Sequence, residues 1–216
     1  MKEVCLLGYG GNSIDVADCV SSDYHTYFLD DDKNKIGMMT PYGLVYGPLS
    51  EATNAREDMV FINTVGSTDN FYRKADIING LNIPIERFIS VTHPHAFVSK
   101  TSSIQPGVAI LANTSIGART AVACHVMILQ NTLISHDCTI SDYCTIAGGV
   151  TICGGVTVGP STYIGAGASI ISGVTIGECC LIGMGAVVLD DVPDNTVVVG
   201  NPARAIRATK CVEVGI

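Results

Sequence analysis

The sequence lacks any long, uninterrupted apolar run, and it is poor in basic residues. Its 216 residues contain 12 Lys and Arg against 20 Asp and Glu, which gives a formal net charge of −8. Without a run of membrane-spanning length, we expect no transmembrane segment. The shortage of basic residues argues against general binding to nucleic acid or to an anionic membrane. A phosphate-bearing ligand would therefore need backbone amides and a few local cations.

A secretory signal pattern is also missing, because the first apolar run, Val4 to Leu7, is short and ends at Gly8. The nine cysteines therefore indicate reduced thiols and a cytoplasmic protein. None of them has the spacing of a zinc site. Cys138, Cys144 and Cys180 fall where the repeat described next needs a small buried residue.

What the sequence does have is a strict period of six over residues 98–188. A helical stripe repeats at 3.6 residues and a simple strand at two, so neither explains the pattern. Self-similarity at a fixed period predicts a solenoid, and the Gly, Asn, Asp and Ser residues in between suit turns. An Ile or Val returns at sixteen consecutive positions, which are Val98, Ile104, Ile110, Ile116, Val122, Ile128, Ile134, Ile140, Ile146, Ile152, Val158, Ile164, Ile170, Ile176, Ile182 and Val188.

This stretch resembles the hexapeptide-repeat family. The resemblance implies a left-handed parallel β-helix, in which three short strands close a triangular coil of about eighteen residues. Residues eighteen positions apart would then stack in neighbouring coils.

Before the repeat, strands and helices alternate, which is typical of a small parallel α/β domain. We therefore divide the chain into a Rossmann-like domain of residues 1–92 and a β-helix domain with its tail of residues 93–216. The sequence predicts strands at 3–7, 26–29, 59–64 and 88–92, a helix at 14–21, and a second helix that Asp69 caps and that ends at Leu81.

The first predicted strand ends in a glycine-rich turn, Gly8 to Ser13, that leads into a helix. This arrangement presents backbone N–H groups to an anion. The pattern approaches the dinucleotide fingerprint, although Ser13 replaces the third glycine, and a tight turn without a ligand is an equal alternative. After the second strand, Asp30 and Asp31 could accept hydrogen bonds from a sugar or a base, or form a solvated acidic loop.

His136 is followed directly by a carboxylate, Asp137, and one coil of the repeat would place Gly154 beside it. A base next to an exposed amide suits acyl transfer, because the base takes a proton from the nucleophile and the N–H holds the oxyanion. Asp137 could orient the ring. The alternatives are a plain surface histidine and zinc catalysis with His125. The γ-type carbonic anhydrase of this fold needs three convergent histidines, two of them closely spaced in sequence, and this chain lacks that pair.

Four motifs follow one another along the chain: Leu7 to Asn12, Phe28 to Asp31, His136-Asp137 within the repeat, and Gly200 to Ala203. In this order they resemble the bacterial acetyltransferases of nucleotide-linked amino sugars, together with the related sialic acid O-acetyltransferases. The resemblance implies a homotrimer with active sites between neighbouring β-helices, acetyl-CoA as co-substrate, a nucleotide sugar as acceptor, and no metal.

The same resemblance implies roles for particular residues. His136 would be the general base with Asp137 beside it, and the N–H of Gly154 would contact the thioester carbonyl. The residues implied for acetyl-CoA are Ala166, Met184, Arg204 and Thr145, the last at a place where some members have a second histidine. Those implied for the nucleotide are Gly10, Gly11, Asn12, Asp30 and Asp31, with Asn12 where members often have histidine.

The leading hypothesis is an acetyl-CoA-dependent N-acetyltransferase acting on the amino group of a nucleotide-linked amino-deoxy sugar, for surface glycans. O-Acetylation of sialic acid or a related sugar is the nearest alternative. A non-catalytic β-helical scaffold and a nicotinamide-dependent enzyme are alternatives from other classes, and Ser13 weakens the latter.

Overall fold

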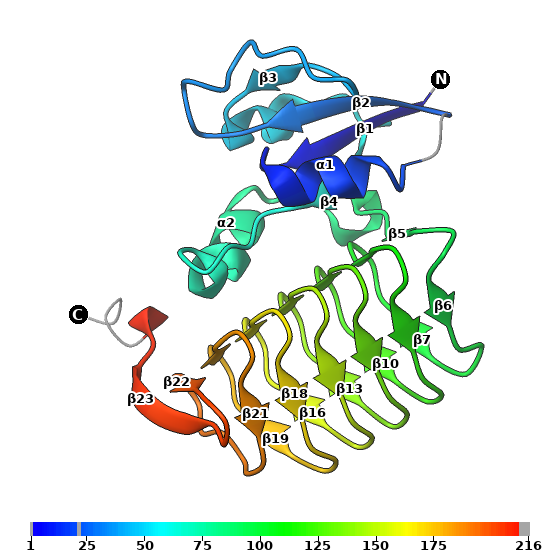
Figure 1. Cartoon of the computed structure of the whole chain (residues 1–216). Helices are drawn as coiled ribbons and strands as arrows, with labels where there is room; N and C mark the ends of the chain where they lie inside the picture. The colour runs from blue at the N-terminus through cyan, green and yellow to red at the C-terminus, as the bar shows by residue number, and fades with distance from the viewer. Residues whose placement is uncertain (1, 21–22, 212–216) are drawn as a thin grey trace.

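A computed structural model describes residues 2–20 and 23–211 of the chain, shown in Figure 1. The N-terminal part is a parallel four-stranded sheet of order β3-β2-β1-β4. Its strands are β1 (Lys2–Leu7), β2 (Tyr24–Leu29), β3 (Val45–Gly47) and β4 (Val60–Asn63). The helices between and after them are α1 (Gly11–Ala17), η1 (Leu49–Asn54), η2 (Phe71–Arg73), α2 (Lys74–Gly80) and η3 (Ile85–Arg87).

The two faces of this sheet are covered by different elements, because successive side chains of a strand point in opposite directions. Val4 and Leu6 of β1 pack with Val16 of α1. Cys5 and Leu7 pack with η1 and α2 on the other face. The sheet is thus buried on both sides, as its apolar strands require.

Several details differ from the sequence-based predictions. The first helix ends at Ala17, and the predicted end at Ser21 lies outside the described residues. Asp69 does not cap a helix. Instead, Ser67 and Asn70 hydrogen-bond to each other before η2, and α2 begins only at Lys74. β3 was not expected, because a three-residue strand carries too little pattern.

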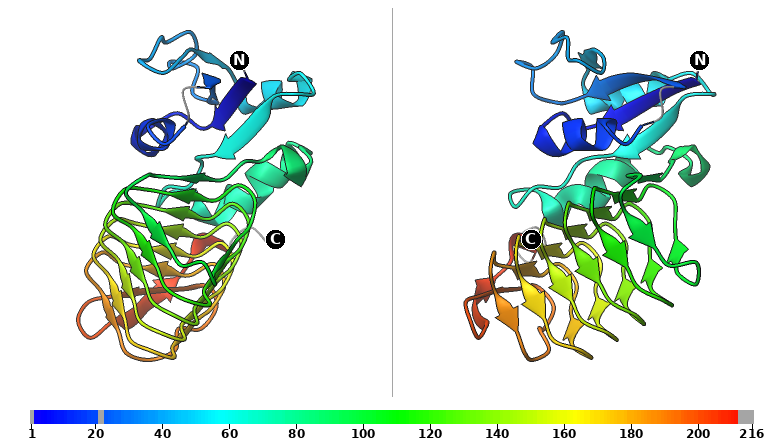
Figure 2. Two further views of the ribbon diagram at one scale, coloured as in Figure 1. Left: turned by 90° about the vertical axis from the view of Figure 1, so that its right-hand side faces the viewer. Right: turned by 45° about the vertical axis from the view of Figure 1, so that its right-hand side comes forward.

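The rest of the chain is a parallel β-helix whose strands lie on three faces, seen obliquely along its axis in the left view of Figure 2. Its strands form three sheets. From β5 (Val91–Thr92) to β21 (Val187–Val188) the paired strands lie eighteen residues apart, as Leu133 does from Ser115 and Thr151, whereas β22 (Thr196–Val199) pairs with β20 (Leu181–Ile182) and, antiparallel, with β23 (Arg204–Ala208). β5 (Val91–Thr92) already pairs with β8 (Ala109–Ile110), so the β-helix starts just before the boundary placed at residue 93. The predicted strand at 88–92 is correspondingly shorter.

The three sheets make three faces. The covered face comprises β5 (Val91–Thr92), β8 (Ala109–Ile110), β11 (Met127–Ile128), β14 (Thr145–Ile146), β17 (Tyr163–Ile164), β20 (Leu181–Ile182), β22 (Thr196–Val199) and β23 (Arg204–Ala208). The six-stranded face comprises β6 (Phe97–Val98), β9 (Ser115–Ile116), β12 (Leu133–Ile134), β15 (Thr151–Ile152), β18 (Ser169–Ile170) and β21 (Val187–Val188). The five-stranded face comprises β7 (Ser103–Ile104), β10 (Ala121–Val122), β13 (Thr139–Ile140), β16 (Thr157–Val158) and β19 (Thr175–Ile176).

The hexad pattern explains both the core and the corners. The Ile and Val positions from Ile110 to Val188 are buried inside the prism, together with Cys138, Cys144 and Cys180. At the corners a residue with positive φ recurs every six positions from Gly107 to Gly185. Gly, Asn and Asp supply many of these positions because they adopt this conformation at low cost.

The N-terminal domain packs on the covered face, where one apolar cluster includes Leu6, Val16 and Phe28 from the first domain and Met127 and Leu129 from the β-helix. Asp15 of α1 also accepts a hydrogen bond from Gln130, at 2.8 Å, at the corner between the covered and six-stranded faces. This shared core fixes the orientation of the first domain on the second.

Lys74 is buried in the same interface, where no carboxylate of residues 2–20 and 23–211 pairs with it. Its Nζ donates to the carbonyl of Cys144 at 3.2 Å and to Thr145 Oγ1 at 3.3 Å. Burial lowers the pKa of the Lys74 ammonium to about 7, because a low-dielectric interior disfavours the charged form.

Lys74 should therefore make the stability of the protein depend on pH. The unfolded state binds the proton more tightly than the folded state, so stability should rise as the pH increases from about 7 toward 10.5, at up to about 1.4 kcal/mol per pH unit. In Lys74→Met this slope should disappear. Denaturant unfolding between pH 7 and 10 checks it, with exposed Lys33→Met as the control. An unchanged slope would mean that Lys74 does not titrate in this range.

Candidate active site

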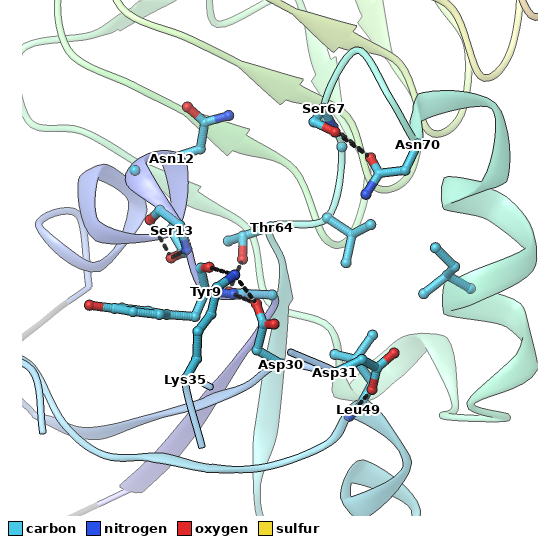
Figure 3. A pocket seen from close by; sticks show the side chains of 16 residues that line it. Tyr9, Asn12, Ser13, Asp30, Asp31, Lys35, Leu49, Thr64, Ser67 and Asn70 are labelled. Carbon is cyan, nitrogen blue, oxygen red and sulfur yellow. Dashed lines mark hydrogen bonds and ion pairs between the residues drawn. The ribbon is translucent and has the colours of Figure 1, made fainter. Parts of the chain in front are cut away.

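A cavity of about 460 Å³ opens at the carboxyl ends of β1, β2 and β4, where ligands bind in parallel α/β sheets. Its lining residues come from the glycine-rich turn, from the loop after β2 and from the loop after β4 (Figure 3). All five residues predicted for the nucleotide line it, namely Gly10, Gly11, Asn12, Asp30 and Asp31.

The glycine-rich turn stays compact without a third glycine because Ser13 takes over its closing role. Ser13 Oγ accepts from the N–H of Gly10 at 2.8 Å and donates to the carbonyl of Gly10 at 2.7 Å. A side chain at Gly10 or Gly11 would meet open space, which is the space where a ligand can approach the backbone. The turn therefore remains open although Ser13 departs from the dinucleotide fingerprint.

Both oxygens of the Asp30 carboxylate already accept hydrogen bonds from the protein. Oδ2 accepts from the N–H of Tyr9 at 2.7 Å and from Lys35 Nζ at 3.0 Å, and Oδ1 accepts from the N–H of Asp32 at 2.8 Å. Asp31 uses one oxygen, Oδ1, on the N–H of Leu49 at 2.9 Å. Asp31 is thus free to accept from a ligand, whereas Asp30 shapes the turn and holds Lys35.

His136 lies at the corner between the six-stranded and five-stranded faces, and its side chain is 61 % exposed. A methyl group on Gly154 would lie 2.6 Å from Cε1 of the imidazole and 2.9 Å from Nε2. Only glycine leaves room for the ring to rest on the backbone of the next coil. Within the described residues, the N–H of Gly154 donates to no protein acceptor, so it can bind a developing oxyanion.

The neighbouring carboxylate fixes how the ring is used. His136 Nδ1 lies 2.7 Å from Asp137 Oδ2. When Nδ1 carries the proton and donates a hydrogen bond to Asp137, Nε2 has a free lone pair on the side of Gly154. The arrangement provides a base atom and an oxyanion donor within one corner of the prism.

Arg119, one coil before Asp137, completes this group and was not singled out from the sequence. Its Nε and Nη2 contact the two oxygens of Asp137 at 2.6 and 2.8 Å. Hydrogen bonds from Arg119 and then His136 hold the pKa of the Asp137 carboxyl at about 2. The eighteen-residue spacing between Arg119 and Asp137 was the available signal.

The residues implied for acetyl-CoA do not lie together with His136 in one chain. Ala166 and Met184 stack at the opposite edge of the six-stranded face, and Met184 is 78 % exposed. Arg204 begins β23, next to the point where the N–H of Ala203 donates to the carbonyl of Val187. Ala166, Met184 and Arg204 thus flank the six-stranded face and do not lie beside His136 of the same chain.

The structure corrects the acetyl-CoA contact that was implied for Thr145. Its side chain is fully buried on the covered face, where Lys74 Nζ donates to it. Gly66, with a φ of 142°, approaches so closely that a Cβ there would lie 2.8 Å from Thr145 Oγ1. The structure therefore leaves this side chain no contact with a coenzyme, and it serves the domain interface.

His125, the competing histidine, is buried at another corner between Phe88 and Tyr143. Burial lowers its pKa to about 4, so it stays neutral as a structural residue. Across residues 2–20 and 23–211, no group of three His, Cys, Asp or Glu side chains is arranged to hold a metal ion. In the same residues, no helix has the length and apolar character needed to cross a membrane.

Comparison with known proteins agrees with this geometry. A family model described as bacterial transferase hexapeptide (six repeats) matches residues 155–190. No curated protein matches the chain in sequence.

Among solved structures, two of the acetyltransferase domain of PglB from Neisseria gonorrhoeae are similar over 95% of this chain. One is 26% identical with a TM-score of 0.85 and covers 100% of that domain; the other, with acetyl coenzyme A, is 25% identical with a TM-score of 0.84 and covers 99%. A histidine mutant of perosamine N-acetyltransferase from Caulobacter crescentus, in complex with CoA and GDP-perosamine, has a TM-score of 0.85 at 24% identity, over 95% of this chain and 97% of its own.

The β-helix thus carries a bacterial transferase hexapeptide repeat, and the fold of the chain is that of the acetyltransferase structures named above. The predicted fold class, a small Rossmann-like sheet followed by a left-handed parallel β-helix, is confirmed. More particularly, the chain is an acetyltransferase, and one of the structures that it resembles was solved with acetyl coenzyme A.

The contact between Arg119 and Asp137 predicts how the Asp137 carboxyl titrates. In Arg119→Met this carboxyl loses the hydrogen bonds that do most to hold its pKa at about 2, so its pKa should rise. Arg119→Lys should lie between the two, and an NMR titration of the labelled Asp side chains measures the change. Lys100→Met, which removes a charge from the same corner, is the control. An Asp137 pKa that stays at about 2 in Arg119→Met would leave Arg119 without influence on this carboxylate.

Proposed function

We propose that the protein transfers the acetyl group of acetyl-CoA to the amino group of a nucleotide-linked amino-deoxy sugar, for surface glycan synthesis. The observation that carries the proposal is the exposed imidazole of His136 on the bare backbone of Gly154. The acceptor is supported by the cavity at the carboxyl ends of the first sheet, and by the similar enzyme that was crystallised with CoA and GDP-perosamine.

In the proposed reaction, Nε2 of His136 removes a proton from the attacking amine as its nitrogen bonds to the thioester carbon. The N–H of Gly154 stabilises the negative charge on the carbonyl oxygen. The C–S bond then breaks, and the imidazolium returns the proton to the sulfur of CoA. The products are the N-acetylated sugar nucleotide and free CoA. Asp137 is proposed to hold the ring in the required tautomer.

A homotrimer would bring the separated parts of this site together. The six-stranded face carries exposed apolar side chains from Phe97, Leu133, Ile171 and Leu189, whereas the five-stranded face presents Ser and Thr. Burial against two other copies is the use that such a patch suggests. Three prisms with this face toward a common axis would place one edge of each against the opposite edge of the next.

That arrangement would set His136 and Gly154 of one copy beside Ala166 and Met184 of its neighbour. It also explains how the nucleotide cavity reaches a base. Asp15 ties α1 to the corner of Gln130, on the Met184 side of the six-stranded face, so a sugar bound there would meet the neighbour's His136. Arg204 is proposed to approach the CoA phosphates. We place the reaction in the cytoplasm, which keeps the nine thiols reduced.

Replacement of the base tests the proposed function. His136→Ala should lower kcat by a factor on the order of 10² or more, because the amine loses its proton acceptor. The assay follows release of the CoA thiol with a panel of UDP-, GDP- and dTDP-linked amino sugars. His95→Ala removes another exposed histidine and should keep full activity. A near-normal rate in His136→Ala would remove this residue from the role.

The assembly can be tested separately. The double variant Leu133→Asp/Ile171→Asp adds two negative charges per subunit to the six-stranded face. In a trimer these charges would lie against like charges of the other copies, so gel filtration should show monomers with little activity. Thr157→Asp/Thr175→Asp adds the same charge to the five-stranded face and should remain trimeric. A wild-type chain that is monomeric and fully active would contradict the shared site.

A further inference from the structure

The negative charge around the nucleotide cavity should repel the anionic ligand proposed above. Its lining includes two carboxylates, Asp30 and Asp31, and the whole chain has a formal net charge of −8. A nucleoside diphosphate adds further negative charge to this surrounding. Among the described residues that line the cavity, Lys35 is the one cation.

Lys35 is held in place by the protein itself. Its Nζ donates to the carbonyl of Tyr9 at 2.8 Å and to Asp30 Oδ2 at 3.0 Å, and Asp30 Oδ2 also accepts from the N–H of Tyr9. A lysine ammonium has three donors, so one N–H is left. The side chain is 34 % exposed, and Figure 3 shows the ammonium between Tyr9 and Asp30 at the cavity.

We propose that Lys35 binds the diphosphate of the nucleotide sugar and makes the enzyme select diphosphate-linked acceptors over uncharged sugars and nucleosides. This inference rests on the proposed function. Asp30 is the positioning residue: its carboxylate ties the ammonium to the backbone of Tyr9. Pre-organisation of this kind lowers the entropy cost of fixing a long side chain when the ligand binds.

The competing explanation is structural, because Lys35 also clamps the glycine-rich turn through the carbonyl of Tyr9. The two roles of Lys35 predict different effects on ligand binding. A clamp affects every ligand of the cavity alike, whereas a phosphate contact affects only ligands that carry phosphate. The ratio of diphosphate to nucleoside affinity therefore separates them, and it cancels any general distortion of the cavity.

The experiment measures dissociation constants by calorimetry for uridine and UDP, guanosine and GDP, and thymidine and dTDP, using the intact protein. At least one diphosphate should bind the wild type. In Lys35→Met its affinity should fall about tenfold or more, as expected for loss of a charge-assisted hydrogen bond, while the matching nucleoside changes little. Lys35→Arg should keep most of the affinity.

Lys33→Met is the matched control, since Lys33 is exposed on the same loop and does not line the cavity. It removes the same charge and should leave both constants unchanged. Equal losses for nucleoside and diphosphate in Lys35→Met, or no loss, would overturn the inference and leave the proposed function intact. Failure of every diphosphate to bind the wild type would instead overturn the nucleotide-linked acceptor itself, and Lys35 with it.

Discussion

The constraint on which the structure depends is the constant length of the coil. Each strand of the β-helix pairs with the strand eighteen residues away, in register, from Phe97 to Val188. A single inserted residue would shift the following strands by one position and turn their apolar side chains outward. Because the register holds, residues eighteen positions apart stack in columns. Arg119 stacks on Asp137 in one column, and His136 stacks on Gly154 in another.

The second requirement is a fixed orientation between the two domains. It comes from the shared apolar core on the covered face, and the buried Lys74 bonds across the same interface beside Gly66. Gly66 also lines the cavity at the carboxyl ends of β1, β2 and β4. The cavity wall and the β-helix are therefore in direct contact, so the same packing that stabilises the chain would set the position of the proposed acceptor.

The β-helix was predictable from the sequence down to contacts between coils, whereas in the N-terminal domain the main strands were predictable but the loop contacts were not. A sixfold repeat of Ile and Val specifies the prism, and counting along it brings His136 to Gly154, because backbone register leaves little freedom. Thr145, which was assigned to acetyl-CoA from the family resemblance, shows what the repeat does not reveal. Its outward position is real, but the N-terminal domain covers that face, and nothing in the repeat reveals which face is covered.

The loops set a different limit, because their side chains can choose among several partners. Asp30 follows a strand that was predicted, yet its carboxylate is satisfied by Tyr9, Lys35 and Asp32 rather than left for a ligand. Lys35 lies on a loop with no pattern, so the sequence alone does not place its ammonium at the cavity.

Both parts of the candidate site use the same device, in which a carboxylate orients a cationic or proton-binding group. Asp30 holds Lys35 in the first domain, and Asp137 holds His136 in the second. In each pair the carboxylate keeps a second partner, Tyr9 or Arg119, that limits its freedom to rotate. An acidic chain can thus handle anionic ligands, because the short-range geometry of a few oriented donors outweighs a distant net charge screened within about 10 Å.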